Sequence, residues 1–412
     1  MDLQLLHPRD RIAMLMSRIY GHRLTTSFGG NISVLDEAGD VWITPAGVDK
    51  GSLTPRDVVR VRSDGRVEGR HEPSSEYPLH RAVYDARPDV SCVLHAHPTS
   101  LVAFAAAQRA PDSRLLPETW RRNGEVAVAR YEDPGSEALG EAVAEKFAAG
   151  ACSVILARHG AVCAGASVAD AFARFDTLEF AARAELRARM LGRPVPLSDA
   201  ERAHERVRAP AGGLPLGRAP HSATFRENEA RESICEFMER GLRHRLFLPS
   251  VGTVSVRLSP DSFVITPHPC DRPSLKPSDL VLVSAGRAEE GRAPSRLARL
   301  HEAIYLSHPG VNAVINASPL NALAFAICRM RMDLERLPEA RARLGAVPLV
   351  PFETLYVSPE KAVAGLSPEN PVFTICNKGV LAVGHDLLSA FDRLEMLENV
   401  ADSLIGTIPL MR

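Results

Sequence analysis

The fold is decided at residues 78–105, which read PLHRAVYDARPDVSCVLHAHPTSLVAFA. The chain returns to this pattern 221 residues later, at 299–326, where it reads RLHEAIYLSHPGVNAVINASPLNALAFA. A second stretch, VWITPAGVDKGSLTPRDVVRV at 41–61, returns as FVITPHPCDRPSLKPSDLVLV at 263–283. Matching over this length predicts two copies of one domain of about 200 residues, which is far longer than the repeats of solenoid proteins.

The repeat sets the domain boundaries that we expect. The first domain is placed at residues 1–200, a linker at 201–225 and the second domain at 226–412. The stretch 192–225 is rich in Pro, Gly and Arg and poor in large apolar residues, which is typical of a linker.

Strands mixed with helices in each copy predict a layered α/β architecture. The expected helices are 10–20, one beginning near Ser74, 99–108, 168–190 and, in the second copy, 227–240. The expected strands include 32–35, 41–44, 90–95 and 152–157.

Composition excludes several classes of protein. The chain has 49 basic and 50 acidic residues, so charge gives no reason to expect nucleic acid or an anionic membrane as a partner. Charges interrupt the apolar positions of residues 1–20, which argues against a signal peptide, and no apolar run reaches the roughly 18 residues of a membrane span. The seven cysteines are scattered, which indicates a reducing, cytoplasmic compartment.

The two copies differ mainly at polar positions. Residues that the common core needs should persist in both copies, whereas the residues of a functional site can be lost from one. The losses are His95 to Asn316, His97 to Ser318, His159 to Lys378 and Glu76 to Leu297. His80 instead reappears as His301, so we expect it to be structural and hydrogen-bonded in the core.

The three lost histidines suit a metal site. Side chains alternate along a strand, so His95 and His97 point the same way and lie roughly 6–7 Å apart at their Cα atoms. His159 follows the apolar run CSVILA and can supply a third ligand. Three imidazoles with a fourth position open are typical of catalytic zinc, and Mn²⁺, Co²⁺ or Fe²⁺ are alternatives. We therefore predict one divalent ion per chain, although two histidines in an H-x-H pattern alone are more often polar residues at a strand end.

Glu76 has two interpretations. It follows Ser74, which we expect to cap a helix, and a glutamate in a first helical turn commonly just complements the helix dipole. A carboxylate beside a metal-bound substrate can also transfer a proton to or from carbon. Its replacement by Leu297 in the second copy favours the catalytic interpretation.

Three turns form a candidate anion pocket. FGGNIS at 28–33 and TPAG at 44–47 allow backbone amides to approach an anion, and the hydroxyls of Ser74 and Ser75 are a third element. Such glycine-rich turns are usually only turns. In the second copy the corresponding segments read VGTVS, TPHP and PSRL, so these features are lost as well.

The ordered set GGNIS, ITPAG, PSSE, LHAHP and RHG resembles the class II aldolase/adducin family across about 200 residues. The resemblance implies an α/β/α domain around a largely antiparallel sheet, a catalytic divalent ion, and four-fold assemblies with active sites between subunits. It implies that His95, His97 and His159 hold the metal and that Glu76 is the acid/base. The residues that it places around a phosphate or equivalent anion are Gly30, Asn31, Ala46, Gly47, Ser74 and Ser75.

Two departures from the family pattern bear on the substrate. Phe28 and Ala46 stand where phosphate-binding relatives often carry hydroxyls, although Thr25, Thr26 or Ser27 can compensate. Tyr131, in ARYEDPGS, is the candidate for the late aromatic acid/base of some aldolases because it falls in a plausible loop.

The predicted function is a metal-dependent lyase that cleaves or forms a carbon–carbon bond of a hydroxyketone or sugar-like substrate, phosphorylated or not, through a metal-stabilised enediolate. The alternatives are a dehydratase, epimerase or decarboxylase with the same chemistry, a non-catalytic adducin-like binding module, and, with little weight, an iron-dependent oxygenase. The second copy is expected to be degenerate. Two such chains are expected to pair as a homodimer that forms a pseudo-four-fold ring, with a higher homo-oligomer as the alternative.

Overall fold

The computed structural model describes residues 6–206, 214–218, 223–357 and 363–411. They form two compact units, the first comprising Met1–Arg114 and Glu118–Arg183 and the second Leu115–Pro117 and Ala184–Arg412. Two segments of the expected linker are regular elements of the second unit, the end of α7 (Asp199–Arg206) and β9 (Leu216–Arg218). Linker residues 207–213 and 219–222 lie outside the described residues.

The first unit is built on a sheet of eight strands in which only the β6–β7 pair is parallel. In spatial order the strands are β4 (Val67–Glu68), β3 (Val59–Val61), β2 (Val41–Ile43), β1 (Asn31–Leu35), β5 (Cys92–Ala96), β8 (Gly160–Gly165), β7 (Ser153–Leu156) and β6 (Ala127–Ala129). β5 is buried along its whole length, as its continuous apolar sequence predicts for a strand covered on both faces.

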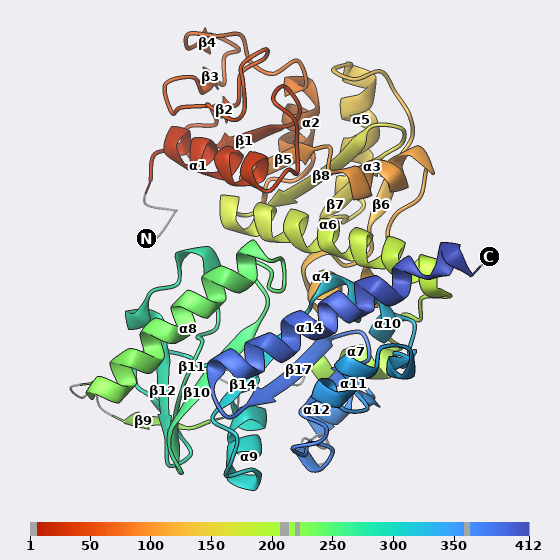
Figure 1. Cartoon of the computed structure of the whole chain (residues 1–412). Helices are drawn as coiled ribbons and strands as arrows, with labels where there is room; N and C mark the ends of the chain where they lie inside the picture. The colour runs from red at the N-terminus through yellow and green to blue at the C-terminus, as the bar shows by residue number, and fades with distance from the viewer. Residues whose placement is uncertain (1–5, 207–213, 219–222, 358–362, 412) are drawn as a thin grey trace. The chain divides into compact units, whose positions relative to one another are not determined.

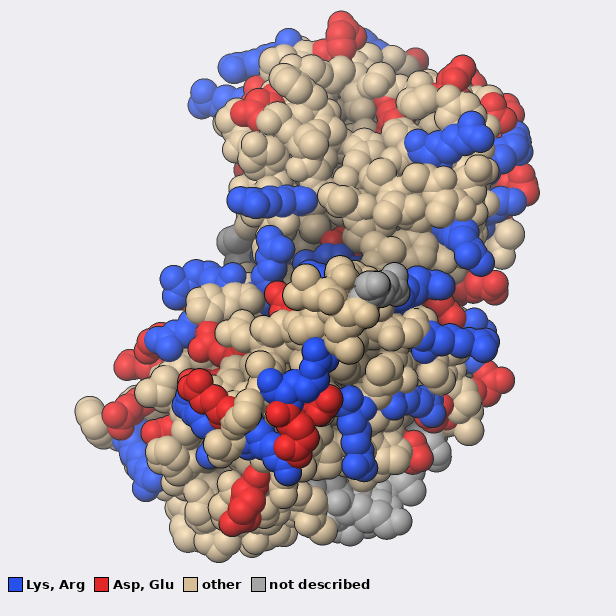
Figure 2. Space-filling view, turned by 45° about the vertical axis from the view of Figure 1, so that its right-hand side comes forward, with Lys and Arg blue, Asp and Glu red and all other residues tan. Residues whose placement is uncertain are grey.

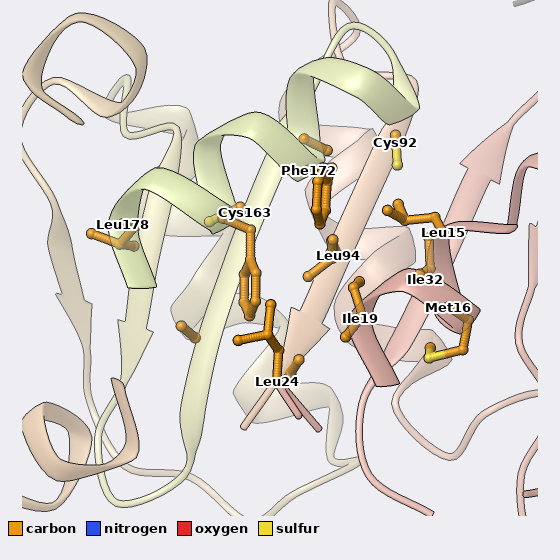
Figure 3. Close-up of a cluster of buried hydrophobic side chains, with 14 of the residues drawn as sticks. Leu15, Met16, Ile19, Leu24, Ile32, Cys92, Leu94, Cys163, Phe172 and Leu178 are labelled. Atoms are coloured by element: carbon orange, nitrogen blue, oxygen red, sulfur yellow. The ribbon is translucent and has the colours of Figure 1, made fainter. Parts of the chain in front are cut away.

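One face of this sheet is covered by α1 (Pro8–Gly21), α3 (Thr99–Ala106) and the first part of α6 (Val168–Leu191). Ile12, Leu15, Met16 and Ile19 recur at helical spacing along α1, and this stripe is buried against the sheet. Figure 3 shows three of these side chains, Leu15, Met16 and Ile19, in the cluster with Ile32 and Leu94 of the strands and Phe172 of α6.

The opposite face of the first sheet is covered by α2 (Tyr77–Ala86) and α5 (Glu137–Ala148). Leu79 and Val83 of α2 join Leu139 and Val143 of α5 in a separate core cluster. The remaining helix, α4 (Pro117–Asn123), lies between α3 and β6 in the chain. Helices on both faces of a mainly antiparallel sheet confirm the predicted α/β/α layers (Figure 1).

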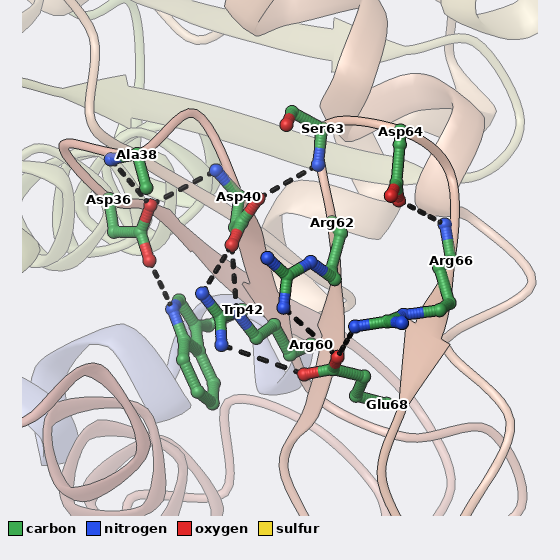
Figure 4. Close-up of polar contacts among 10 residues, drawn as sticks. All are labelled: Asp36, Ala38, Asp40, Trp42, Arg60, Arg62, Ser63, Asp64, Arg66 and Glu68. Carbon is green, nitrogen blue, oxygen red and sulfur yellow. Dashed lines mark hydrogen bonds and ion pairs between the residues drawn. The ribbon is translucent and has the colours of Figure 1, made fainter.

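Ion pairs join the short strands at one edge of this sheet (Figure 4). Arg60 of β3 reaches Asp40 at 2.5 Å and Glu68 of β4 at 3.5 Å. The indole nitrogen of Trp42 donates to Asp36 over 2.8 Å. Strands of two and three residues bury little apolar surface, so these polar contacts help to fix their pairing.

The second unit repeats the arrangement with nine strands. In spatial order they are β15 (Leu349–Val350), β16 (Val372–Ile375), β17 (Gly379–Gly384), β14 (Ala313–Ala317), β10 (Thr253–Ser259), β11 (Ser262–Ile265), β12 (Val281–Ser284), β13 (Arg287–Glu289) and β9. The added strand β9 pairs in parallel with β13.

Among the described residues, five helices of the second unit stand where the repeat places counterparts of α1, α2, α3, α4 and α6, in that order: α8 (Phe225–Arg243), α9 (Ala298–Ser307), α10 (Leu320–Ile327), α11 (Pro338–Leu344) and α14 (Leu387–Gly406). The short helix α12 (Thr354–Val357) follows α11. α8 and α14 pack together through the rings of Phe237 and Phe391, whose centroids are 5.1 Å apart, and α9 packs on the other face through Leu300 and Ile304.

Acidic and basic side chains are interspersed over the face drawn in Figure 2. Within the described ranges, no helix is long and apolar enough to cross a membrane.

Candidate metal centre

Three strand ends of the first unit bring the candidate residues together. β5 lies between β1 and β8, so that His95 is opposite Asn31 on one side and Val162 on the other. His97 follows the end of β5, and His159 immediately precedes the first residue of β8. Histidines that are 62 residues apart in the sequence therefore meet at one edge of the sheet.

The Nε2 atoms of the three histidines converge. The Nε2 atom of His97 lies 2.8 Å from that of His95 and 3.0 Å from that of His159. His95 is completely buried, whereas His97 and His159 are half-buried. The cluster is therefore closed to solvent at His95 and partly open at His97 and His159.

The protonation pattern of this cluster fits a bound cation. The Nδ1 atom of His95 lies 3.0 Å from the carbonyl oxygen of Ala161 and must donate its proton there. The Nε2 atom of a neutral His95 is then a lone pair that faces two other imidazole nitrogens. Imidazole nitrogens that converge in this way are a ligand set suited to a divalent metal ion, which would supply the positive charge between them.

The pKa values of the exposed pair support neutral imidazoles. Burial, followed by the charge of neighbouring histidines, lowers the pKa of His97 to about 3 and that of His159 to about 4. Both rings are therefore unprotonated at neutral pH, which is the state that binds a metal.

Glu76 faces the same cluster. Its carboxylate oxygens lie 3.0 Å from the Nε2 atom of His95 and 3.3 Å from that of His159. Burial opposes ionisation of this carboxyl group, but positive charge at the imidazole cluster, which a bound cation supplies when the rings are neutral, and the side-chain amide of Asn31 outweigh burial and lower its pKa. Glu76 is thus a carboxylate at neutral pH, beside the position where the three imidazoles could hold an ion.

A buried hydrogen-bond chain fixes the orientation of Glu76. The amide nitrogen of Asn31 donates to Glu76 over 3.2 Å, and the amide oxygen of Asn31 accepts from Nε2 of His80. Nδ1 of His80 in turn accepts from the hydroxyl of Ser33 over 2.6 Å. His80 is completely buried, and burial lowers its pKa to about 3, so it has the neutral, core role that its persistence in both copies predicts.

The loops of the expected anion pocket adjoin one another. The backbone nitrogen of Lys50 donates to Ser27 over 2.8 Å, and the buried ammonium of Lys50 donates to the carbonyls of Pro45 and Val48. The amide of Ala46 donates to the carbonyl of Glu72, so it is already used. Gly47 and Ser75 are exposed, and the buried Gly30 has a φ of +72° that favours glycine. Hydrogen bonds therefore hold the loops that carry the expected pocket residues. The side-chain amide of Asn31 is directed at Glu76.

The start of α2 differs from the prediction. The residue that precedes the helix is Glu76 rather than Ser74, and the hydroxyl of Ser74 accepts from the backbone nitrogen of Glu76 over 3.3 Å. The turn formed by Ser74 comes before the helix, because Pro78 can occupy only the first turn. This turn places the Glu76 side chain toward β1 and β5.

Tyr131 lies in the loop between β6 and α5. It is 46% exposed, and its hydroxyl donates to Asp133 over 3.1 Å. The guanidinium of Arg158 lies 5.5 Å from the centre of its ring. Gly135, in the same loop, packs closely against the carbonyl oxygen of Ser75, so the loop adjoins the residue before Glu76.

Sequence reasoning missed three contributors to the site. A Cβ atom on Gly160 would lie 2.7 Å from a ring carbon of His97, and one on Gly29 would lie 3.2 Å from Nδ1 of the same ring. The carbonyl of Ala161 orients His95, and a backbone carbonyl leaves no mark in the side-chain sequence. Comparison of the two copies assigns Gly160 to the shared turn and not to the site, because its counterpart Gly379 is retained.

The second unit keeps the buried chain and lacks the cluster. His301 contacts the hydroxyl of Ser255 at 2.7 Å and donates to the amide oxygen of Asn316 at 2.8 Å. Asn316 stands where the first copy has His95. It thus supplies the oxygen that Asn31 supplies in the first unit.

Comparison with known proteins agrees with the repeat. The profile of the class II aldolase and adducin N-terminal domain matches twice, at residues 10–186 and 232–405. A 3-oxo-tetronate 4-phosphate decarboxylase of Escherichia coli is 30% identical over 179 residues, which are 42% of this chain and 84% of that protein. A 5-deoxy-D-ribulose 1-phosphate aldolase of Bacillus thuringiensis is 31% identical over 196 residues, 47% of this chain and 91% of the relative.

A methylthioribulose-1-phosphate dehydratase of Cronobacter sakazakii is 29% identical over 177 residues, 40% of this chain and 91% of the relative. The reactions named for these three relatives differ from one another. Each relative is similar to the chain over less than half of the chain's length. The two profile matches together span most of the chain, which therefore belongs to the class II aldolase and adducin family as a tandem duplication.

Proposed function

We propose that the chain is a metal-dependent lyase of the class II aldolase type, with its active site in the first copy. The observation that supports this most directly is the convergence of three imidazole Nε2 atoms beside the ionised carboxylate of Glu76. His95, His97 and His159 would hold one divalent ion, most plausibly Zn²⁺, with Mn²⁺, Co²⁺ or Fe²⁺ as alternatives. When bound, the ion supplies Lewis-acid stabilisation of the negative charge that develops on a hydroxyketone as a carbon–carbon bond breaks.

The residues of this chain supply the proton transfers. The carboxylate of Glu76 accepts a proton from the substrate and returns it to the carbon that is left after cleavage. Asn31 holds Glu76 in place, and the low pKa of this carboxyl group means that it is ionised at neutral pH, with both oxygens free of a proton. Burial of His95 and Glu76 keeps water away from the reacting atoms.

The substrate class proposed is a hydroxyketone or sugar-like compound. The names of the relatives include phosphorylated sugars, and the tied loops around Gly30, Gly47 and Ser75 provide a place for an anion. A decarboxylase, dehydratase or epimerase would use the same ligands and the same carboxylate, and the decarboxylase and dehydratase among the relatives support these alternatives. Tyr131 is proposed as a further acid or base.

Metal content per chain tests the proposal. Protein purified without a chelator or a metal-binding tag is expected to hold close to one divalent ion per chain by elemental analysis, and His95→Ala with His97→Ala is expected to lose it. The matched control is His244→Ala with His385→Ala, which removes two exposed histidines of the second copy and should leave metal content unaltered.

Turnover of aldehyde plus hydroxyketone donors is then measured on the loaded protein. Wild-type protein that takes up no ion after reconstitution would contradict the lyase and leave a paired, adducin-like binding module. One ion per chain without carbon–carbon bond turnover would favour the dehydratase, epimerase or decarboxylase.

A further inference from the structure

Arg158 adjoins the candidate metal centre along the chain. Arg158 lies in the turn between β7 and β8 and immediately precedes His159, whose Nε2 atom belongs to the cluster. Its backbone nitrogen is fixed by a hydrogen bond of 2.8 Å to the carbonyl of Ala105. The side chain is exposed, so a long cation projects into solvent one residue from a metal ligand.

The guanidinium is held by an aromatic ring and not by an acid. It lies 5.5 Å from the centre of the Tyr131 ring, a distance typical of a cation–π contact. Among the described residues, the guanidinium of Arg158 has no ion pair, because Asp133 accepts from the Tyr131 hydroxyl instead. The charge of Arg158 is therefore available to an anion from solution.

The contact with Tyr131 also connects two sides of the site. The loop that carries Tyr131 packs against Ser75 through Gly135, and Ser75 precedes Glu76. Arg158 is joined to His159 by the backbone. Arg158 and Tyr131 thus connect the segment that carries the metal ligand His159 with the segment that carries Glu76.

The second copy shows what the turn itself requires. Arg158 has a φ of +62°, and the corresponding Asn377 has a φ of +56°. Asparagine tolerates this left-handed conformation better than arginine does. Asn377 is also buried and donates to the carbonyl oxygens of Leu115 and Val195, whereas Arg158 is exposed and adopts the same conformation at a higher cost.

The geometry points to Arg158 as a substrate-binding residue that pairs with a carboxylate of a hydroxyketone acid. This assignment rests on the proposed function, because it places the substrate at the metal centre. Phe28, 70% exposed, and Ala46 lack the hydroxyls that would suit a doubly charged phosphate. One guanidinium matches the single charge and planar, two-oxygen shape of a carboxylate.

Ligand binding by the full chain loaded with Co²⁺ tests the assignment. Three probes share the hydroxyketone group and differ beside it: hydroxypyruvate carries a carboxylate, dihydroxyacetone is neutral, and dihydroxyacetone phosphate carries a phosphate. Dissociation constants are measured by calorimetry, and the Co²⁺ absorption spectrum reports contact with the metal. The variants are Arg158→Asn, Arg158→Lys and, as a control with the same loss of charge at a φ of +58°, Arg23→Asn.

We expect Arg158→Asn to weaken hydroxypyruvate binding by about tenfold or more while dihydroxyacetone changes by less than about twofold. Arg158→Lys should fall between wild type and Arg158→Asn, because it keeps the charge and loses the planar fork. Arg23→Asn should leave all three dissociation constants at the wild-type values.

Several results would overturn the assignment. One is that hydroxypyruvate fails to bind the wild type loaded with Co²⁺. Another is that Arg158→Asn weakens the binding of hydroxypyruvate and dihydroxyacetone equally, or weakens neither. A third is that Arg158→Asn weakens the binding of dihydroxyacetone phosphate alone. A wild-type chain that takes up no Co²⁺ would instead show that the proposed function has failed, and the assignment with it. An Arg158→Asn variant with normal Co²⁺ uptake and unchanged hydroxypyruvate binding removes only the role of Arg158.

Discussion

At the scale of single residues, hydrogen bonds to neighbouring groups decide which side-chain atoms of the site can contact an ion or a substrate. The Nδ1 proton of His95 is committed to a backbone carbonyl, so the Nε2 atom is a lone pair. The amide of Asn31 is committed at both ends, to His80 and Glu76, so the carboxylate cannot rotate freely. Fixed orientation of this kind is what lets one carboxylate act as both acceptor and donor of a proton.

Replacing Glu76 by glutamine should separate catalysis from metal binding. Glu76→Gln preserves the size of the side chain and removes its basicity, so metal content should stay close to that of wild type while turnover falls by about 100-fold to 10,000-fold. Steady-state kinetics and elemental analysis of the same preparation measure both quantities. The control is Glu72→Gln, an exposed glutamate on the same loop.

Turnover within about tenfold of wild type in Glu76→Gln would show that another group transfers the proton. Loss of the metal in this variant would instead give Glu76 a role as a ligand.

The metal-site residues were predictable because the chain contains two copies of one domain that can be compared with each other. Loss of His95, His97, His159 and Glu76 from one copy, within a retained apolar pattern, separated them from the scaffold. Arg158 was not found, because nothing in the sequence tells that an exposed arginine lies over a tyrosine 27 residues earlier.

At the scale of elements, α1, α6 and the short strand β2 were predicted, whereas the helix α5, the strand β8 and several short strands were not. α1 and α6 lie within one or two residues of their expected bounds, because apolar residues recur along them at helical spacing. β3, β4 and β6 have only two or three residues, too few to show an alternating pattern. The start of α2 was placed two residues early, because a serine that forms a turn resembles a helix cap in sequence.

α6 also carries a buried acid that should make stability depend on pH. Burial, followed by the charge of Glu179, raises the pKa of Asp176 to about 7, although Arg183, Arg122 and Arg18 oppose the shift. One of its carboxylate oxygens is buried without a hydrogen-bond partner. The folded state therefore holds this proton more tightly than the unfolded state, and the contribution of Asp176 to stability is lost as pH rises from about 4 to about 7.

Asp176→Asn removes this titration and should raise the free energy of unfolding at pH 8 by on the order of 2 kcal/mol. The gain should disappear near pH 4, where the folded wild type is already protonated. Urea unfolding at several pH values measures the difference. A gain that is the same at pH 4 and pH 8 would show that packing, and not ionisation, is responsible.

At the scale of the whole molecule, the duplication suggests how chains assemble. Two alike domains in one chain can stand where two subunits stand in a four-fold assembly of single-domain relatives. We predict two chains per particle, to be measured by sedimentation equilibrium at the concentrations used for activity assays. A stable monomer with full activity would contradict the predicted ring.

The two copies were predictable from sequence because more than 20 consecutive positions correspond without a gap in each matched stretch. The added strand β9 was not, because Leu216–Arg218 lies in a Pro- and Gly-rich stretch that is typical of a linker. Parallel pairing with β13 depends on a partner about 70 residues away, which local sequence does not specify.

The buried histidine uses a different asparagine as its hydrogen-bond acceptor in each copy. This difference bears on which substitutions could restore a metal site in the second copy. Thr253 stands where the first copy has Asn31, so His301 relies on the amide of Asn316 at the former ligand position. Threonine at 253 together with histidine at 316 would leave the buried His301 without the amide oxygen that accepts its proton in the present chain, so the exchanges at these two positions are expected to be coupled. Restoring histidine at 316 is therefore expected to require asparagine at 253 as well.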